Sequence, residues 1–262
     1  EVVMTYPLIG NYGITPDMES KKAWPDGYIV RELSRMPSNF RCEGTLQEFL
    51  EKQDIPGIKG IDTRDLTKIL REKGTMNGMI TTHENYDLEE ILPKLAAYEV
   101  GDVVSKVTCD EAYVLPGDSY KVALLDSGAK NNIARSLNKR GCEVTVYPAH
   151  TKAEEILATH PDGIMLSNGP GDPKTCTDII EEVRKLYESD VPIFAICLGH
   201  QLMALANGGD THKLKYGHRG GNHPDKAMQH GRVYLSYQNH GYAVEMESLR
   251  HRQPAGTWRN TS

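Results

Sequence analysis

Short apolar segments alternate regularly with amphipathic ones in the second half of this 262-residue chain. Buried parallel strands are near-continuous apolar runs, and the helices between them carry apolar residues at a period of about 3.6. The pattern predicts strands over Lys121–Asp126, Cys142–Tyr147, Gly163–Ser167 and Val191–Ile196, and helices over Asn131–Lys139, Thr151–Thr159, Thr177–Glu188 and Gly199–Ala206. Because βαβ units make right-handed crossovers, we expect an α/β fold whose mainly parallel central sheet is flanked by helices.

One cysteine lies where the last predicted strand turns into its helix. Cys197 follows the apolar run Val191–Ile196 and precedes the helical segment Gly199–Ala206. A side chain at such a turn is lifted out of the sheet, and the helix N-terminus behind it can stabilise a thiolate and a developing oxyanion. The pattern is that of a nucleophile elbow, G-x-S-x-G, with Ala195 in place of the first glycine. The alternative interpretation is a buried, inert cysteine.

A glycine-rich segment follows the neighbouring strand. Asn168-Gly169-Pro170-Gly171 comes directly after the predicted strand Gly163–Ser167. Sites in open α/β sheets lie at the carboxyl ends of the strands, so we expect this segment and Cys197 to meet. Glycine at positions 169 and 171 would let the backbone approach a substrate closely, whereas the alternative interpretation is a plain tight turn.

Four segments carry a resemblance to a known family. They are Cys197-Leu198-Gly199-His200-Gln201, Leu166-Ser167-Asn168-Gly169-Pro170-Gly171-Asp172-Pro173, Gly217-His218-Arg219-Gly220-Gly221-Asn222-His223-Pro224 and Gln238-Asn239-His240-Gly241-Tyr242-Ala243-Val244. The first two resemble signatures of class I glutamine amidotransferases. All four, together with the block Ile58–Ile80, are similar to the small, glutaminase subunits of carbamoyl phosphate synthetase, and the resemblance extends from Met4 to about Leu249.

The resemblance implies a glutamine-hydrolysing site built on a cysteine nucleophile. Cys197 would form a γ-glutamyl thioester and release ammonia, and the backbone N–H groups of Leu198 and Gly169 would hold the oxyanion. The residues implied to bind the substrate glutamine are Gly169, Gly171, Leu198, Gln201, Asn239, Gly241 and Tyr242, the last three on a loop that holds the α-amino and carboxylate groups. His200 is expected to pack along the helix rather than act as the base.

The resemblance also implies a partner. Ammonia would pass to a large subunit that makes carbamoyl phosphate for arginine and pyrimidine synthesis, in a cytoplasmic ligase. The ATP, other nucleotide and magnesium sites would lie on that large subunit, so no cofactor is expected in this chain. The block Ile58–Ile80, which other amidotransferases lack, would mainly contact the large subunit. This block argues against the alternative of another amidotransferase, such as an anthranilate or GMP synthetase partner.

One family motif has no counterpart in the sequence. In the family, a His-Pro-Glu triplet after the N-H-G-Y segment supplies the general base and its orienting acid, and the printed sequence contains no such triplet. His223-Pro224-Asp225 imitates it, but in an upstream segment. The chain opens inside a predicted strand, at Glu1–Tyr6, and lacks this triplet near its end, so it is expected to be truncated at both ends. The alternatives that this leaves open are a catalytically impaired fragment and a non-catalytic subunit that only binds a synthetase partner.

Two domains and a tail are expected. Residues 1–118 would form an N-terminal α/β domain and residues 119–249 the amidotransferase domain, joined by a linker at Pro116–Ser119. Residues 250–262 are polar and basic and are expected to be disordered. In the first domain the sequence predicts strands over Val2–Tyr6 and Tyr28–Leu33, and helices over Thr45–Lys52 and from Asp62 or Thr63 to Lys73, the last ended by Gly74.

Composition excludes several other functions. The formal net charge of −6 gives no reason to expect nucleic-acid binding, and no apolar run approaches the length of about 20 residues that a membrane helix needs. Five scattered cysteines without C-x-x-C pairs indicate reduced thiols and hence the cytosol. The spacing of His212, His218 and His223 does not match zinc sites, so no metal is expected. Gly217–Pro224 is predicted to form a loop near the site, with its Arg and His bonded to the backbone.

Overall fold

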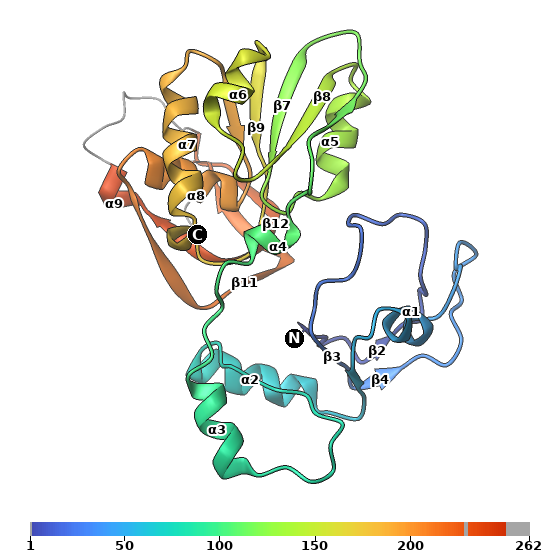
Figure 1. Cartoon of the computed structure of the whole chain (residues 1–262). Coiled ribbons are helices and arrows are strands. Elements are labelled where there is room, and N and C mark those ends of the chain that lie inside the picture. Colours follow the sequence, from blue (N-terminus) through green and yellow to red (C-terminus); the bar gives the residue numbers. More distant parts are fainter. Residues whose placement is uncertain (1, 228–229, 250–262) are drawn as a thin grey trace. The chain divides into compact units, whose positions relative to one another are not determined.

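The computed structural model describes residues 2–227 and 230–249, and the predicted tail, residues 250–262, lies outside them. The chain divides into two compact units, the first ending at Glu99 and the second beginning at Val100 (Figure 1). Both units combine helices with mainly parallel strands, which confirms the predicted α/β class.

The first unit combines very short parallel strands with three helices in its described part. Strands β1 (Val2–Val3), β3 (Tyr28–Ile29) and β5 (Gly57–Ile58) form one sheet in that order, and β2 (Leu8–Ile9) pairs with β4 (Glu32–Leu33). The helices are α1 (Leu46–Lys52), α2 (Thr63–Lys73) and α3 (Leu88–Ala96). The strand predicted over residues 28–33 is thus two strands, because β3 and β4 pair in different sheets.

Capping fixes the two helices that the sequence predicts in this unit. The Thr45 hydroxyl accepts the Glu48 N–H at 3.1 Å, and the Glu48 carboxylate accepts the Thr45 N–H at 2.9 Å, which completes the predicted capping box of α1. Asp62 caps α2 by accepting the Asp65 N–H at 3.1 Å. Gly74 ends α2 with φ of 95°, a conformation that favours glycine.

The second unit is built on a five-stranded sheet with the order β10-β9-β7-β8-β6. Its strands are β6 (Tyr113–Leu115), β7 (Lys121–Asp126), β8 (Glu143–Pro148), β9 (Gly163–Leu166) and β10 (Ile193–Ala195). Strands β7 to β10 pair in parallel, and β6 at the edge is antiparallel. The predicted mainly parallel sheet is confirmed, and the carboxyl ends of its four parallel strands meet at one edge.

Helices cover both faces of this sheet (Figure 1). Helix α5 (Asn131–Asn138) lies on one face, and α6 (Ala153–Ala158), α7 (Thr177–Glu188) and α8 (Leu198–Ala206) lie on the other. Successive strand residues alternate between the two faces: Leu124 packs with Ala134 of α5, whereas Leu125 packs with Ile156 and Leu202 on the opposite face. Among the described residues, no helix has the length and apolarity needed to cross a membrane.

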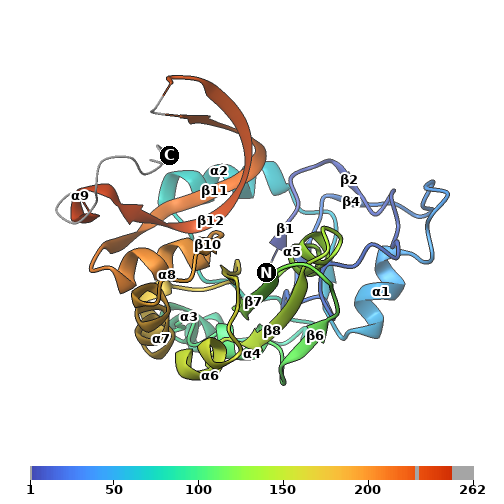
Figure 2. The same cartoon turned by 90° about the horizontal axis from the view of Figure 1, so that it is seen from above.

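Smaller elements complete the second unit. They are α4 (Val104–Val107), a 3₁₀ turn at Pro173–Thr175, α9 (Met246–Leu249), and an antiparallel ribbon of β11 (Asp210–Lys226) and β12 (Val233–Glu245). Figure 2 shows this ribbon as a long, curved pair of strands. The expected loop Gly217–Pro224 is instead part of β11, because register shifts in the pairing absorb its glycines.

The boundary between the two units lies before residues 100–118, which the sequence assigns to the first domain. Residues Tyr113–Leu115 form β6, which pairs with β8 of the main sheet. Val104 of α4 is buried in the core of the same unit. Pro116–Ser119 therefore connects β6 to β7 within one unit. Its turn-forming residues do not distinguish such a connection from a linker between domains.

A buried carboxylate joins α7 to the start of α6. Glu182 accepts the Ala153 N–H at 2.8 Å and pairs with Lys152 and Lys185, each at 3.1 Å. These contacts lower the pKa of Glu182 to about 2, and the Ala153 N–H is the largest cause. Because Glu182→Ala leaves that buried N–H without its acceptor, we expect the free energy of unfolding in urea to fall by about 1–3 kcal/mol.

The effect of Glu182→Ala should depend on pH. The folded-state pKa lies below the ordinary value of 4.5, so the stabilisation is fully present above that value and is lost as the pH falls toward 2. The stability difference between wild type and variant should therefore shrink from about pH 5 to about pH 3. Exposed Glu181 on the same helix provides the control, Glu181→Ala, which should change little. A Glu182→Ala difference that does not vary with pH would contradict this account.

Candidate active site

The predicted nucleophile turn is present between β10 and α8. Cys197 directly precedes Leu198, the first residue of α8, and its backbone has φ of 51° and ψ of −108°. Residues with side chains rarely adopt such a positive φ. The strand–turn–helix arrangement predicted around Cys197 is confirmed, with a helix that begins one residue earlier than expected.

Close packing behind Cys197 requires a glycine. A Cβ at Gly199 would lie 2.6 Å from the carbonyl oxygen of Leu166 and 2.7 Å from its Cβ. The Gly199 N–H donates to the carbonyl oxygen of Ser167 at 3.0 Å. Helix α8 is therefore pressed against the carboxyl end of β9, and this packing brings Cys197 next to the residues that follow that strand.

Residues Asn168–Asp172, which we call the glycine loop, lie beside the Cys197 turn. A Cβ at Gly169 would lie 2.2 Å from the carbonyl oxygen of Ser127 and 2.6 Å from Cδ2 of Leu198, so no side chain fits there. Gly171 has φ of 92°, which again favours glycine. The predicted meeting of this loop with Cys197 at the carboxyl edge of the sheet is confirmed.

Asn168 fastens the glycine loop to the residues that follow β7. Its Oδ1 accepts the Lys130 N–H at 3.1 Å, and its Nδ2 donates to the Gly128 carbonyl oxygen at 3.1 Å. The loop is therefore held from two sides, by α8 and by the β7–α5 connection.

Opposing influences act on the Cys197 thiol. Burial raises the pKa of Cys197, while the Leu198 N–H, the Arg219 charge, the Gly169 N–H and the Lys130 charge all lower it. The two N–H groups that approach the sulfur are also where an oxyanion formed by attack of that sulfur would find its donors. Two backbone donors and two cations thus act on one thiol.

Strand β12 forms another side of the site. The Asn239 carbonyl oxygen lies 3.8 Å from the Cys197 Sγ, so the thiol can donate to it. Asn239, Gly241 and Tyr242 are expected on a loop, but the structure has them within β12. The ribbon pairing extends through this segment, where Asn239 lies opposite Arg219 and Tyr242 opposite Lys213.

Gln201 connects helix α8 to β12. Its side chain is buried, and its Nε2 donates to the Tyr242 carbonyl oxygen at 2.7 Å. Burial and the nearby carboxylate of Asp172, the last residue of the glycine loop, raise the pKa of the Tyr242 hydroxyl. The structure thus brings Gln201, Tyr242 and the glycine loop together, and their contacts with a substrate stay a prediction.

Three histidines gather on the ribbon. The ring centroid of His218 lies 5.1 Å from that of His223 and 4.9 Å from that of His240. Burial lowers the pKa of His240, against the opposing effect of the Tyr242 backbone. His240 Nδ1 lies 2.8 Å from the Tyr242 carbonyl oxygen, and its Nε2 lies 3.2 Å from Nδ1 of His218 and 3.1 Å from Oε1 of Gln238. Across the described ranges, no three His, Cys, Asp or Glu side chains are arranged to hold a metal.

His200 lies on α8, as the sequence predicts. Part of its side chain is exposed, and burial of the ring lowers its pKa. In residues 2–227 and 230–249, the hydrogen bond of the Cys197 thiol goes to a carbonyl oxygen and not to a histidine or carboxylate.

Arg219 and Lys130 are the residues near the thiol that the sequence did not identify as part of the site. Arg219 Nη1 donates to the carbonyl oxygens of His218, at 2.8 Å, and of His240, which confirms the backbone bonds predicted for this arginine. Its charge close to Cys197 could not be predicted, because β11 reads as a loop. Lys130 comes shortly after the carboxyl end of β7. It could have been identified from the sequence, because sites in open α/β sheets lie at that edge.

Removing the Arg219 charge is expected to make Cys197 less reactive near neutral pH. Because this charge lowers the pKa of the thiol, Arg219→Met should raise that pKa and leave less thiolate at a given pH. The pH profile of iodoacetamide alkylation at Cys197, followed by peptide mass spectrometry, should therefore move to higher pH. Arg232→Met, which removes a charge from the residue before β12, is the control. An unshifted profile for Arg219→Met would refute the electrostatic role.

Family models and curated relatives of this chain agree with one another. The family model of the carbamoyl-phosphate synthase small chain, CPSase domain, matches residues 1–80, and the model of class-I glutamine amidotransferases matches residues 123–258. The carbamoyl phosphate synthase small chain of Listeria innocua is 53% identical over 250 residues, which cover 95% of this chain and 68% of the relative. That of Clostridium perfringens is 52% identical over 244 residues, covering 93% and 69%.

Solved structures resemble the chain more distantly. A glutamine amidotransferase from Thermotoga maritima has a TM-score of 0.39 and 13% sequence identity. The match covers 48% of this chain and 62% of that one.

Proposed function

Since the chain belongs to the family of carbamoyl phosphate synthase small chains and carries a class I glutamine amidotransferase domain, we propose that it hydrolyses glutamine to glutamate and ammonia through a cysteine thioester. The observation that carries this proposal is the convergence of one thiol and two backbone N–H groups, those of Leu198 and Gly169, at the carboxyl edge of the sheet. Such a convergence suits acyl transfer, which needs a nucleophile and an oxyanion hole.

The proposed reaction has two stages. The Cys197 thiolate attacks the carboxamide carbon of glutamine, and the carbonyl oxygen becomes an oxyanion that the N–H groups of Leu198 and Gly169 stabilise. Collapse of this intermediate forms the thioester and breaks the C–N bond, and the nitrogen takes up a proton and leaves as ammonia. Water then attacks the thioester, which releases glutamate and restores the thiol.

The amino-acid end of glutamine is proposed to lie along β12. The residues assigned to it are Gly171, Gln201, Asn239, Gly241 and Tyr242. The bond from Gln201 to Tyr242 and the nearness of the Asp172 carboxylate to the Tyr242 hydroxyl support this assignment, because they place β12 beside α8 and the glycine loop before substrate arrives.

We further propose that the ammonia passes to a large subunit for carbamoyl phosphate synthesis, which serves arginine and pyrimidine formation. ATP and magnesium would bind to that subunit, and this chain would need no cofactor. The shared name of the relatives from Listeria innocua and Clostridium perfringens supports the assignment, as does the match of residues 1–80 to the small-chain domain.

A second candidate is a subunit that binds glutamine and a synthetase partner without turnover. The observation that favours it is that, among the described residues, the Cys197 thiol hydrogen-bonds the Asn239 carbonyl oxygen and no histidine or carboxylate. A nucleophile without a partner base loses thiolate activation and protonation of the leaving group, each worth about 10²–10⁴-fold in rate.

Two measurements on the same chain separate these candidates. The first is covalent labelling of Cys197 by 6-diazo-5-oxo-norleucine, a diazoketone analogue of glutamine, with and without excess glutamine. The second is glutamate release from glutamine, by the chain alone and with a relative's large subunit. Labelling that glutamine prevents, together with glutamate release, supports hydrolysis, whereas labelling without release supports the second candidate. No labelling at Cys197, with normal iodoacetamide reactivity, would overturn both.

A further inference from the structure

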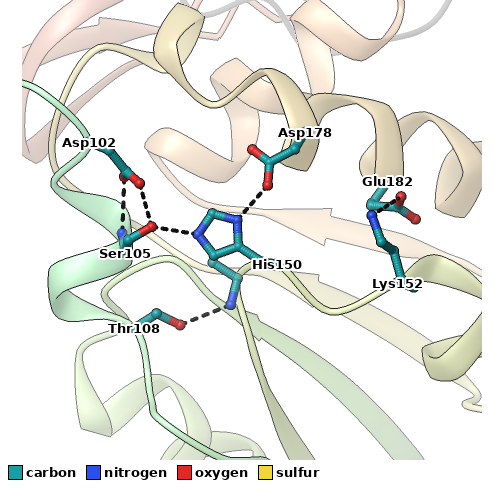
Figure 3. A network of polar contacts seen from close by, with 8 residues as sticks. Asp102, Ser105, Thr108, His150, Lys152, Asp178 and Glu182 are labelled. Atoms are coloured by element: carbon teal, nitrogen blue, oxygen red, sulfur yellow. Dashed lines mark hydrogen bonds and ion pairs between the residues drawn. The ribbon is translucent and has the colours of Figure 1, made fainter.

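A polar network outside the glutamine site joins three segments of the second unit (Figure 3). Ser105 Oγ lies 2.7 Å from Nε2 of His150, whose Nδ1 lies 2.5 Å from Oδ2 of Asp178. Asp102 accepts the Ser105 N–H at 3.1 Å and also contacts its hydroxyl. The network therefore connects the segment around α4 to the loop after β8 and to the first turn of α7.

Serine, histidine and aspartate in this order resemble a nucleophilic triad, but the surroundings oppose that role. The Asp102 carboxylate competes with His150 for the Ser105 proton, and its negative charge disfavours an alkoxide beside it. All of these side chains are also exposed to water. The arrangement is better suited to holding the segment around α4 in place.

Further bonds fasten this segment, residues Asp102–Cys109, which we call the strap. The Thr108 hydroxyl accepts the Ala149 N–H at 2.9 Å, and the Cys109 N–H donates to Asp126 Oδ2 at 2.8 Å. Asp126 ends β7, and Ala149 directly follows β8. The strap therefore crosses the carboxyl edge of the sheet, where the glycine loop and Cys197 also lie.

The strap packs directly against the backbone of the glycine loop and of its support. The ideal Cβ position of Gly171 lies 2.7 Å from Cγ2 of Val103, and that of Gly128 lies 2.8 Å from Cγ2 of Val107. The Gly128 carbonyl oxygen is also the acceptor for the Asn168 side chain. These distances leave no room for a side chain at either glycine. The strap therefore lies close to the loop backbone, and a displaced strap would change the space available to the loop.

We propose that the strap is a positioning element for glutamine hydrolysis, and that Ser105 and His150 fix it so that the Gly169 N–H stays aimed at the reacting oxygen. The proposal rests on the proposed function, because it concerns control of that same site.

Three variants test the strap, and one serves as a matched control. Ser105→Ala and His150→Ala break the network, and Val103→Ala removes the contact with Gly171. The control is Lys152→Met, because the Lys152 ammonium bridges the same β8–α6 loop to α7 through Glu182, at 3.1 Å, rather than through the strap (Figure 3).

The first readout is amide hydrogen exchange in peptides covering residues 167–172, which requires no activity. We expect about fivefold faster exchange there in the three strap variants, and no change in Lys152→Met. The second readout is labelling of Cys197. The rate with 6-diazo-5-oxo-norleucine should fall about tenfold, because this reagent needs the ordered pocket, while the rate with iodoacetamide should stay within about twofold.

The outcomes distinguish the two proposals. The proposal for the strap would be wrong if the strap variants have the wild-type unfolding temperature and the amides of residues 167–172 exchange at the wild-type rate. If the diazoketone does not label the wild-type chain, the proposed function is wrong. Hydrogen exchange then tests the strap by itself: faster exchange of residues 167–172 in the variants supports it, and unaltered exchange contradicts it. Val103→Ala keeps the test valid if His150→Ala does not fold, since it leaves the polar network intact.

Discussion

Replacing Cys197 with alanine is expected to abolish glutamine hydrolysis. The proposed thioester forms at this sulfur, and the N–H groups of Leu198 and Gly169 are aimed at it, so they cannot promote the reaction without a nucleophile. Loss of a covalent nucleophile lowers kcat by about 10⁴-fold or more. Glutamate release by the chain with a large subunit measures this loss directly, and labelling by the diazoketone should disappear with it.

The other cysteines supply the control for this experiment. Cys142 is a half-buried free thiol that packs at the edge of the core under α5, and Cys142→Ala should leave glutamate release within about twofold of wild type. A Cys197→Ala chain that retains more than about a tenth of wild-type activity would exclude the thioester route.

Gly169→Ala is expected to have the second largest effect. The added Cβ would lie 2.2 Å from the Ser127 carbonyl oxygen and 2.6 Å from Cδ2 of Leu198, so the glycine loop must move and its N–H is no longer aimed at the oxyanion. Loss of one oxyanion donor lowers kcat by about 10²–10³-fold. We expect this fall in glutamate release while the iodoacetamide reactivity of Cys197 changes much less, because alkylation forms no oxyanion.

Gly163, at the start of β9, provides a control that separates an effect on catalysis from an effect on folding. Gly163 begins β9, and a Cβ there would lie at an ordinary distance of 3.7 Å from the nearest backbone atom, the Pro192 carbonyl oxygen. Gly163→Ala should therefore keep wild-type activity and stability. Equal losses of activity in Gly163→Ala and Gly169→Ala would show that the loop acts through general packing and not through its N–H group.

The sequence predicts the central sheet well, because the signals there are strong. Strand β7 and helix α7 have the predicted bounds, Lys121–Asp126 and Thr177–Glu188, since apolar residues recur clearly at the period of a strand or helix. Cys197 and the glycine loop meet as expected, because parallel strands deliver their carboxyl ends to one edge.

The rest of the fold depends on pairing that local patterns do not reveal. Strand β6 has three residues, too few for a period, and its place is decided by pairing with β8. The segment Gly217–Pro224 contains glycine, asparagine and proline, which are depleted in strands, yet it pairs with β12 across two register shifts. The network of Asp102, Ser105, His150 and Asp178 draws on three separate segments, so no spacing in the sequence indicates it.

The backbone of Cys197 has a further consequence. A side chain held at φ of 51° and ψ of −108° costs of the order of 1–3 kcal/mol, which glycine at the same position would avoid. Cys197→Gly is thus expected to have a higher free energy of unfolding than the present chain, but it cannot attack glutamine. At this single residue, the choice that would best preserve the fold and the choice that permits chemistry are different amino acids, and the present chain has the reactive one.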